Sequence, residues 1–245
     1  MNSKSHPLDN FLALDTAGGS IYSAVYKSGE VFCKSANREE SRSRNIAVLT
    51  KELLQENEMS CDDLRCVIVA LGPGSFTGLR VGLAFAKGII AAREVPLIGV
   101  TRFEQITRQL SGSMQLNFDG ALAPDEVMYI LMHKKSYYRR YVSTDGAEQL
   151  DVVVIEKPQD LVIEAQAQGA NNSSAYFIDC AKPKFKDDLP DGLSVIEVVS
   201  KIESLFGVAE EKVGKKEFAS WTDLEPLYVQ RSSAEVRAQV AKTRK

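Results

Sequence analysis

The sequence predicts an α/β fold in which a mixed sheet flanked by helices occurs twice along the chain. Short apolar and β-branched runs, typical of strands, alternate with segments whose apolar residues recur at the period of a helix. The order of these segments in the first half returns, more faintly, in the second half. The chain has 245 residues, 44% of them hydrophobic and 26% charged, which suits a globular protein of one large or two small domains.

Three strands are predicted at the start of the chain. Residues 10–16 form an almost uninterrupted apolar run, which is typical of a buried central strand. Residues 20–27 and 30–36 follow, and the Ser28-Gly29 pair between them favours a hairpin turn. The sheet is therefore expected to begin with an antiparallel meander.

Helices and strands alternate in the next part of the chain. Thr101 is expected to cap a helix, because Glu104 stands at the capping-box position three residues later. Parallel pairing is expected here, since a helix separates each strand from the next. Strands are predicted at residues 65–71 and 96–100, and helices at 46–54, 79–93 and 101–110.

The second half repeats this order of elements without a residue-level repeat. Two βββαβα halves are typical of the duplicated ribonuclease-H-like fold, the actin-like (ASKHA) class. Strands are predicted at 127–133, 137–143, 149–155 and 175–180, and helices at 158–169 and 194–211. The predicted organisation is a flexible N-terminal arm (1–9), two actin-like subdomains (10–112 and 121–230) and a basic tail (231–245).

The loop at residues 72–78 is a candidate phosphate loop. It has three glycines and a proline before a helix N-terminus, where free amides and the helix dipole favour an anion. It lacks the Gly-Lys-Ser/Thr sequence of a Walker A loop, and a tight strand-to-helix turn is the alternative. With the end of the first strand, the candidate residues are Asp15, Thr16, Gly72, Gly74, Ser75, Thr77 and Gly78.

Small residues form two ridges along the helix at 79–93. Interior glycines cost roughly 1 kcal/mol each relative to alanine, so a close contact must compensate for them. One ridge can lie against the sheet, and the other suggests a neighbouring helix from a partner subunit; packing entirely within the chain is the alternative. The ridges are Gly78, Gly82 and Ala86, and Ala84, Gly88 and Ala92.

The run ALGPGSFTGLRVGLAFAKGIIAAREVPLIGVTRFEQI, preceded by FLALDTAGGSIYSAVY, resembles the TsaB (YeaZ) family. The resemblance covers residues 11–110, and EPLYVQRSSAEV near the end is similar to the family's C-terminal segment. It implies an actin-like fold and the role of partner subunit in the bacterial machinery that forms threonylcarbamoyladenosine on tRNA.

The resemblance also implies the partners of the chain. A TsaD-type subunit would perform the transfer, a TsaE-type ATPase would join the complex, tRNA would be reached through the complex, and the chain alone would form a homodimer. The helices at 46–54 and 79–93 would form the partner interface. Its expected residues are Ile46, Leu49, Leu53, Leu79, Gly82, Leu83, Ala86 and Ile90.

A catalytic role of this chain is not expected. TsaD-type relatives carry a metal-binding His-x-x-x-His pair after the shared pattern, and Arg102 and Ile106 stand at the matching positions here. Neither a guanidinium nor an alkyl side chain can bind a cation. Asp15 matches the acidic residue of the superfamily's first phosphate loop, but the hydroxyl residues that should follow are replaced by Ala17-Gly18-Gly19.

We therefore expect no catalytic residue, no metal and no cofactor in this chain, with ATP and a metal used by the complex. The four cysteines form no CxxC pair and only two histidines are present, so a zinc site is also unexpected. The alternatives are a small-molecule kinase or ATPase of the actin-like superfamily and a metallopeptidase. A net charge of −3 and no apolar segment of membrane-spanning length predict a cytoplasmic protein without general affinity for membranes.

Overall fold

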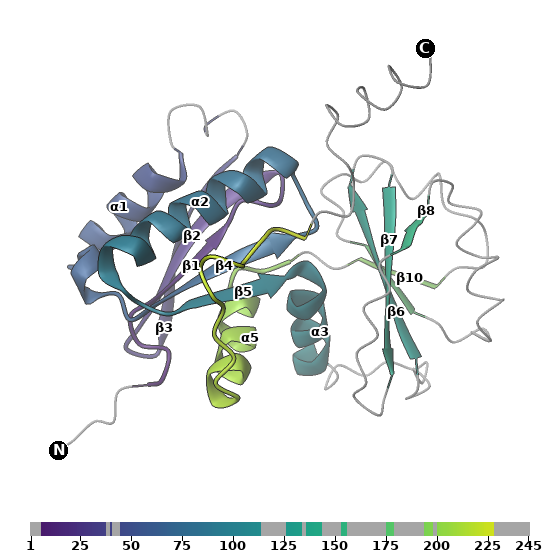
Figure 1. Ribbon diagram of the computed structural model, residues 1–245. Helices are drawn as coiled ribbons and strands as arrows, with labels where there is room; N and C mark the ends of the chain where they lie inside the picture. Colours follow the sequence, from purple (N-terminus) through teal and green to yellow (C-terminus); the bar gives the residue numbers. More distant parts are fainter. Residues whose placement is uncertain are drawn as a thin grey trace, which may run out of the picture. The chain divides into compact units, whose positions relative to one another are not determined.

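The computed structural model describes residues 6–37, 40, 45–113, 126–133, 136–143, 153–155, 175–178, 194–197 and 200–227 (Figure 1). The chain divides into two compact units. The first consists of Met1–Ser113 and Ser200–Leu227, and the second of Met114–Val199 and Tyr228–Lys245. No helix in these described ranges is long and apolar enough to cross a membrane.

The first unit contains a five-stranded mixed sheet with the order β3-β2-β1-β4-β5. Its antiparallel part pairs β1 with β2 and β2 with β3, and its parallel part pairs β1 with β4 and β4 with β5, so the predicted meander that turns parallel is confirmed. The strands are β1 (Phe11–Asp15), β2 (Ser20–Lys27), β3 (Glu30–Asn37), β4 (Cys66–Gly72) and β5 (Leu97–Thr101).

Two layers of helices cover this sheet (Figure 1). On one face α1 packs over β2 and β3, and α2 packs over β4 and β1. On the other face α5 packs against β4 and β5 beside α3. The helices are α1 (Ile46–Glu56), α2 (Phe76–Arg93), α3 (Arg102–Ser113) and α5 (Glu203–Gly214), and a short 3₁₀ helix, η2 (Cys61–Asp63), precedes β4.

Every residue of β1 and of β4 is buried, as the apolar runs predict. Successive side chains of a strand point to opposite faces, so both central strands contribute to two apolar cores. Leu12 and Leu14 pack under α1 and α2, whereas Phe11 and Ala13 pack against α5. The unit is thus a three-layer α/β/α sandwich.

The helix caps follow the sequence signals. Thr101 donates its amide to Glu104 Oε2 (2.6 Å), and the Glu104 amide donates to Thr101 Oγ1 (3.2 Å), which confirms the predicted capping box. The helix α2 begins at Phe76 rather than at Leu79, because the Ser75 side chain caps it by accepting the amide of Gly78.

The second unit contains another five-stranded sheet, with the order β8-β7-β6-β9-β10. Its antiparallel pairs are β6–β7 and β7–β8, and its parallel pairs are β6–β9 and β9–β10, which is the topology of the first sheet. The predicted duplication is therefore confirmed. The strands are β6 (Glu126–His133), β7 (Ser136–Ser143), β8 (Val153–Ile155), β9 (Ala175–Ile178) and β10 (Ser194–Glu197).

The predicted boundary of the second subdomain, 121–230, is wrong for its last part. Residues 194–211 are not one helix: β10 ends at Glu197, and α5 runs from Glu203 to Gly214 and belongs to the first unit. The reason is apolar burial, because Leu205 and Phe206 fill the core on the second face of the first sheet. Sequence order alone does not reveal this long-range return of the chain.

The predicted flexible arm at 1–9 is also too long, since Leu8 is buried in the same core as α5. The predicted helix at 158–169 and the basic tail at 231–245 lie outside the described residues.

Candidate functional site

Two loops meet at the carboxyl ends of the parallel strands, where the sequence predicts phosphate binding. The Ser75 amide donates to the Ala17 carbonyl (2.7 Å), and the Thr16 hydroxyl donates to the Gly78 carbonyl (2.7 Å). The Gly78 amide donates to the Ser75 hydroxyl (3.2 Å). Two amides that could bind a phosphate at the N-terminus of α2 are therefore engaged by the chain itself.

Glycine is required at this junction because the two backbones approach so closely. A Cβ atom on Gly78 would collide with the carbonyl oxygen of Thr16, and one on Gly74 would collide with that of Ala17. Gly72 has a φ of +87°, in the region that favours glycine. These contacts favour the tight-turn interpretation of the loop.

The structure brings together six of the seven residues predicted for the phosphate loop, and the Thr77 side chain faces solvent. Asp15 and Thr16 are buried at the end of β1, beside the turn made by Gly72, Gly74, Ser75 and Gly78.

Asp15 forms a buried ion pair with Arg102, the residue that stands at the position of a metal ligand in TsaD-type sequences. Asp15 Oδ2 lies 3.2 Å from Arg102 Nη1, and the two side chains are 7% and 6% exposed. Asp15 Oδ1 also accepts the amide of Ala17 (2.8 Å). A signal for this pair is present in the sequence: Asp15 ends β1 and Arg102 follows β5, and the carboxyl ends of parallel strands meet at one edge of the sheet.

The surroundings of this pair do not suit a cation. The guanidinium of Arg102 is positively charged, and Ile106, on the same helix, is an alkyl side chain buried in the interior. In the described part of the chain no group of three or more His, Cys, Asp or Glu side chains could hold a metal ion. That the chain binds no metal stays a prediction.

The residues predicted for the partner interface do not face outward. All eight are buried within the first unit: Ile46, Leu49, Leu53, Leu79, Gly82, Leu83, Ala86 and Ile90. As surface residues this prediction is wrong, because the apolar faces of α1 and α2 are used to cover the sheet. A Cβ on Gly82 would collide with the Thr16 hydroxyl, so a large residue there would disrupt the fold itself.

The second small-residue ridge of α2 does face solvent. Ala84, Gly88 and Ala92 are exposed, and a Cβ on Gly88 would meet nothing within 4 Å. Val81 on the same side is 48% exposed, which is unusual for a large apolar residue, and Phe85 is half-buried. The outer face of α2 therefore presents apolar side chains and little steric bulk.

The comparisons with known proteins agree with this architecture. The family model for "TsaD: tRNA N6-adenosine threonylcarbamoyltransferase" matches residues 31–130. The tRNA threonylcarbamoyladenosine biosynthesis protein TsaB of Escherichia coli (strain K12) is 31% identical over 90 residues, which cover 37% of this chain and 39% of that protein. TsaB of Bacillus subtilis (strain 168) is 29% identical over 114 residues, covering 46% and 48%. These two matches span less than half the length of each relative.

A longer match extends the similarity over both units. TsaB of Haemophilus influenzae is 20% identical over 220 residues, which cover 89% of this chain and 92% of that protein. These matches make the chain similar to the TsaB (YeaZ) family. The solved structure of YeaZ from Pseudomonas aeruginosa has a TM-score of 0.68 at 15% identity and covers 90% of this chain and 100% of that one. This likeness and the repeated sheet topology confirm the predicted actin-like α/β fold.

Proposed function

We propose that this chain is a TsaB-type, non-catalytic partner subunit that supports a TsaD-type transferase in forming threonylcarbamoyladenosine on tRNA. The names of its relatives support the pathway. The observation that supports a non-catalytic role is the buried Arg102–Asp15 pair. It places a fixed positive charge where the resemblance to TsaD-type proteins implies a metal ligand, and it neutralises the carboxylate that a nucleotide-bound cation would need.

The rest of the assembly follows from the same proposal. The TsaD-type subunit supplies the metal and the transfer chemistry, and a TsaE-type ATPase uses ATP. The tRNA is bound through the complex, which works in the cytoplasm. Without its partner, this chain pairs with itself through the same surface.

That surface is the outer face of α2, with the exposed side of α1 next to it. Its small residues, Ala84 and Gly88, would let a helix of the partner approach closely. Val81 and Phe85 would supply apolar area that becomes buried in the complex. The buried residues of α1 and α2 support this face from beneath rather than contacting the partner.

The test compares two arginine substitutions at exposed helical glycines. In Gly88→Arg the side chain projects from the outer face of α2, and in the control Gly214→Arg it projects from the end of α5, a helix on the other face of the sheet. A Cβ at either position would meet nothing within 4 Å, so both variants are expected to fold. Gly88→Arg should fail to co-elute with the TsaD-type subunit and should not support tRNA modification in a reconstituted mixture, whereas Gly214→Arg should do both.

Two results would refute the proposal. If tRNA modification proceeds equally well without this chain, the partner role is wrong. If the isolated chain binds ATP tightly with magnesium, the kinase or ATPase alternative is favoured instead.

A further inference from the structure

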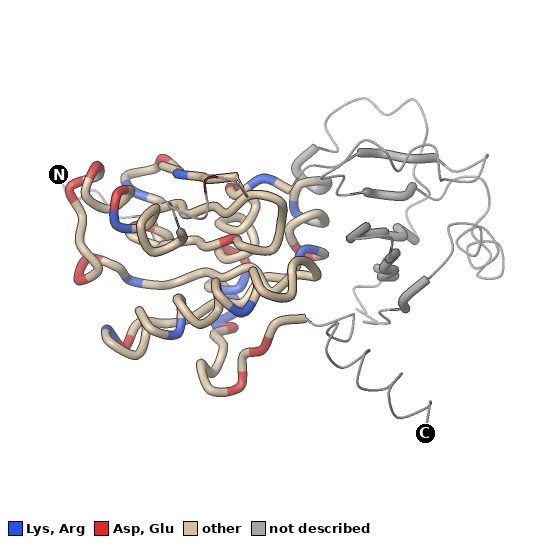
Figure 2. The backbone as a smooth tube through the Cα atoms, turned by 90° about the horizontal axis from the view of Figure 1, so that it is seen from above, with Lys and Arg blue, Asp and Glu red and all other residues tan. Residues whose placement is uncertain are grey.

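The segment that follows α5, Lys215–Leu227, returns along the sheet face that carries α1 and α2. The Ala219 amide donates to the Leu97 carbonyl on the edge strand β5 (2.9 Å), and the Leu227 amide donates to the Leu71 carbonyl at the end of β4 (2.8 Å). Leu224 packs between these points, against the core that lies beneath α2. The segment therefore runs alongside α2, as both views show (Figures 1 and 2).

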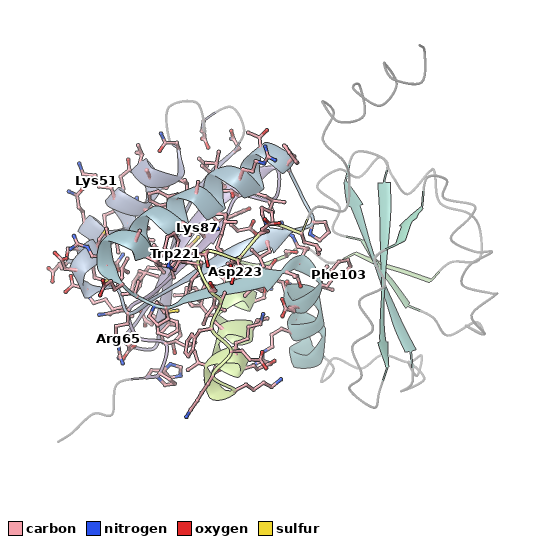
Figure 3. The ribbon with its side chains drawn as sticks, in the orientation of Figure 1. Lys51, Arg65, Lys87, Phe103, Trp221 and Asp223 are labelled. Atoms are coloured by element: carbon pink, nitrogen blue, oxygen red, sulfur yellow. The ribbon has the colours of Figure 1, made fainter. Side chains whose placement is uncertain are left out.

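This segment exposes its largest aromatic side chain. Trp221, the single tryptophan of the chain, is 54% exposed, although tryptophan has the largest apolar surface to bury. It follows directly on Ala219 and Ser220 along the β5 edge, and Figure 3 labels it together with Asp223 on this segment. Leu224, only three residues further on, is half-buried and packs against the core, so Trp221 is exposed on a segment that is anchored on both sides.

Beyond Lys215 and Lys216, which are exposed at the end of α5, the charge of this segment is one-sided. From Glu217 to Leu227 it carries Glu217, Asp223 and Glu225 and no lysine or arginine, and all three of these acidic residues are exposed. A phosphate backbone would be repelled here, whereas lysine and arginine side chains would be attracted. A guanidinium can also lie over the face of an indole ring. The surface therefore suits a basic protein surface rather than tRNA.

We infer that Trp221 anchors the transferase subunit, and that the interface on the outer face of α2 continues onto the acidic segment Glu217–Leu227. The inference rests on the proposed function. The partner on this surface is the part of the TsaD-type subunit that lies over α2, and its lysine and arginine side chains face the three carboxylates. Tryptophan is enriched among residues that dominate binding energy, and charged residues around such an anchor govern association rate and specificity.

The first test measures the affinity of the full chain for the TsaD-type subunit. Trp221→Ala should weaken binding at least about 30-fold without a change in melting temperature, because the side chain is exposed. The control is Phe32→Ala, which removes another exposed aromatic side chain at the opposite edge of the sheet and should leave the affinity unchanged. The triple variant Glu217→Gln, Asp223→Asn, Glu225→Gln should slow association and reduce its salt dependence.

A second test needs no substitution. Because the chain has one tryptophan, 5-fluorotryptophan gives a single ¹⁹F resonance that reports on Trp221. The resonance should shift and lose its solvent accessibility when the TsaD-type subunit is added. An unchanged resonance in the formed complex would overturn the inference, and a shift caused by self-association alone would make a second copy of this chain the occupant and overturn it as well.

The outcomes separate this inference from the proposed function. If Trp221→Ala binds like the unmodified chain while Gly88→Arg does not bind, the extension onto the acidic segment is wrong and the proposed function stands. If both variants bind normally, the partner surface on α2 is wrong too.

Discussion

Replacement of Arg102 by methionine tests the ion pair on which the non-catalytic interpretation depends. Methionine preserves much of the side-chain volume but leaves the Asp15 carboxylate, 7% exposed, without the guanidinium 3.2 Å away. At that separation two unit charges attract each other by about 5 kcal/mol at an effective dielectric constant of about 20. Measured losses on breaking buried pairs are about 3–5 kcal/mol, and we expect a decrease in unfolding free energy within that range.

The assay is urea unfolding followed by circular dichroism, with three further variants, of which Asp15→Asn alone completes the double-mutant cycle. Asp15→Asn combined with Arg102→Met removes both charges, so the double variant should be more stable than Arg102→Met alone. Arg102→Lys should lie between the unmodified chain and Arg102→Met, because an ammonium keeps the charge but not the planar fork of donors.

The double-mutant cycle isolates the energy of the pair itself. A coupling energy of about 2–3 kcal/mol between the two positions is expected for charges this deeply buried. If Arg102→Met unfolds within about 1 kcal/mol of the unmodified chain, or if the cycle gives no coupling, the pair does not stabilise the loop junction and the reasoning fails.

Three further predictions concern α2, Cys66 and metal content. Gly78→Ala should lower the free energy of unfolding by about 2–4 kcal/mol, because its Cβ would collide with the Thr16 carbonyl. Gly88→Ala should raise the free energy of unfolding by up to about 1 kcal/mol, because its Cβ meets nothing within 4 Å. Equal melting temperatures of the two variants would contradict this prediction. Burial raises the pKa of the Cys66 thiol to about 12, so the thiolate forms first in the unfolded chain as pH rises above about 9. The contribution of this thiol to the free energy of unfolding is fully present at neutral pH and should fall by about 1.4 kcal/mol by pH 10. Urea denaturation at both pH values should show this decrease in the unmodified chain and not in Cys66→Ala. Elemental analysis of the purified protein should find no stoichiometric transition metal, and about one metal per chain would refute the absence of a site.

The local order of elements in the first half followed from the sequence. Its strands were predicted within a residue or two because β1 and β4 are buried on both faces and therefore read as continuous apolar runs. The Thr101–Glu104 cap was predictable for the same reason, since a capping box depends on residues three apart. The resemblance to the TsaB (YeaZ) family came from the glycine-rich segment between β4 and α2, whose residues are constrained by close backbone contacts.

The direction in which each helix face points was decided only by the tertiary structure. Both ridges of α2 look alike in sequence, yet Gly82 lies against Thr16 and Gly88 lies in solvent, because the sheet and the β1 loop select one of them. The residues expected at the partner surface are buried in the core of the first unit, beneath the outer face of α2.

Only part of the long-range pairing followed from the sequence: it places Asp15 and Arg102 at the carboxyl ends of predicted strands, but it does not give the order of the strands. Asp15 and Arg102 are 87 positions apart, and only the parallel pairing of β1, β4 and β5 brings their side chains to one edge. The return of α5 and of the Trp221 segment to the first unit depends on apolar burial against a sheet formed by residues more than 100 positions earlier. Periodicity and capping are local properties of the chain, and they determine where its helices and strands form. The free energy of burying one helix or sheet face against another depends on the whole fold, and it determines which residues remain exposed to bind a partner.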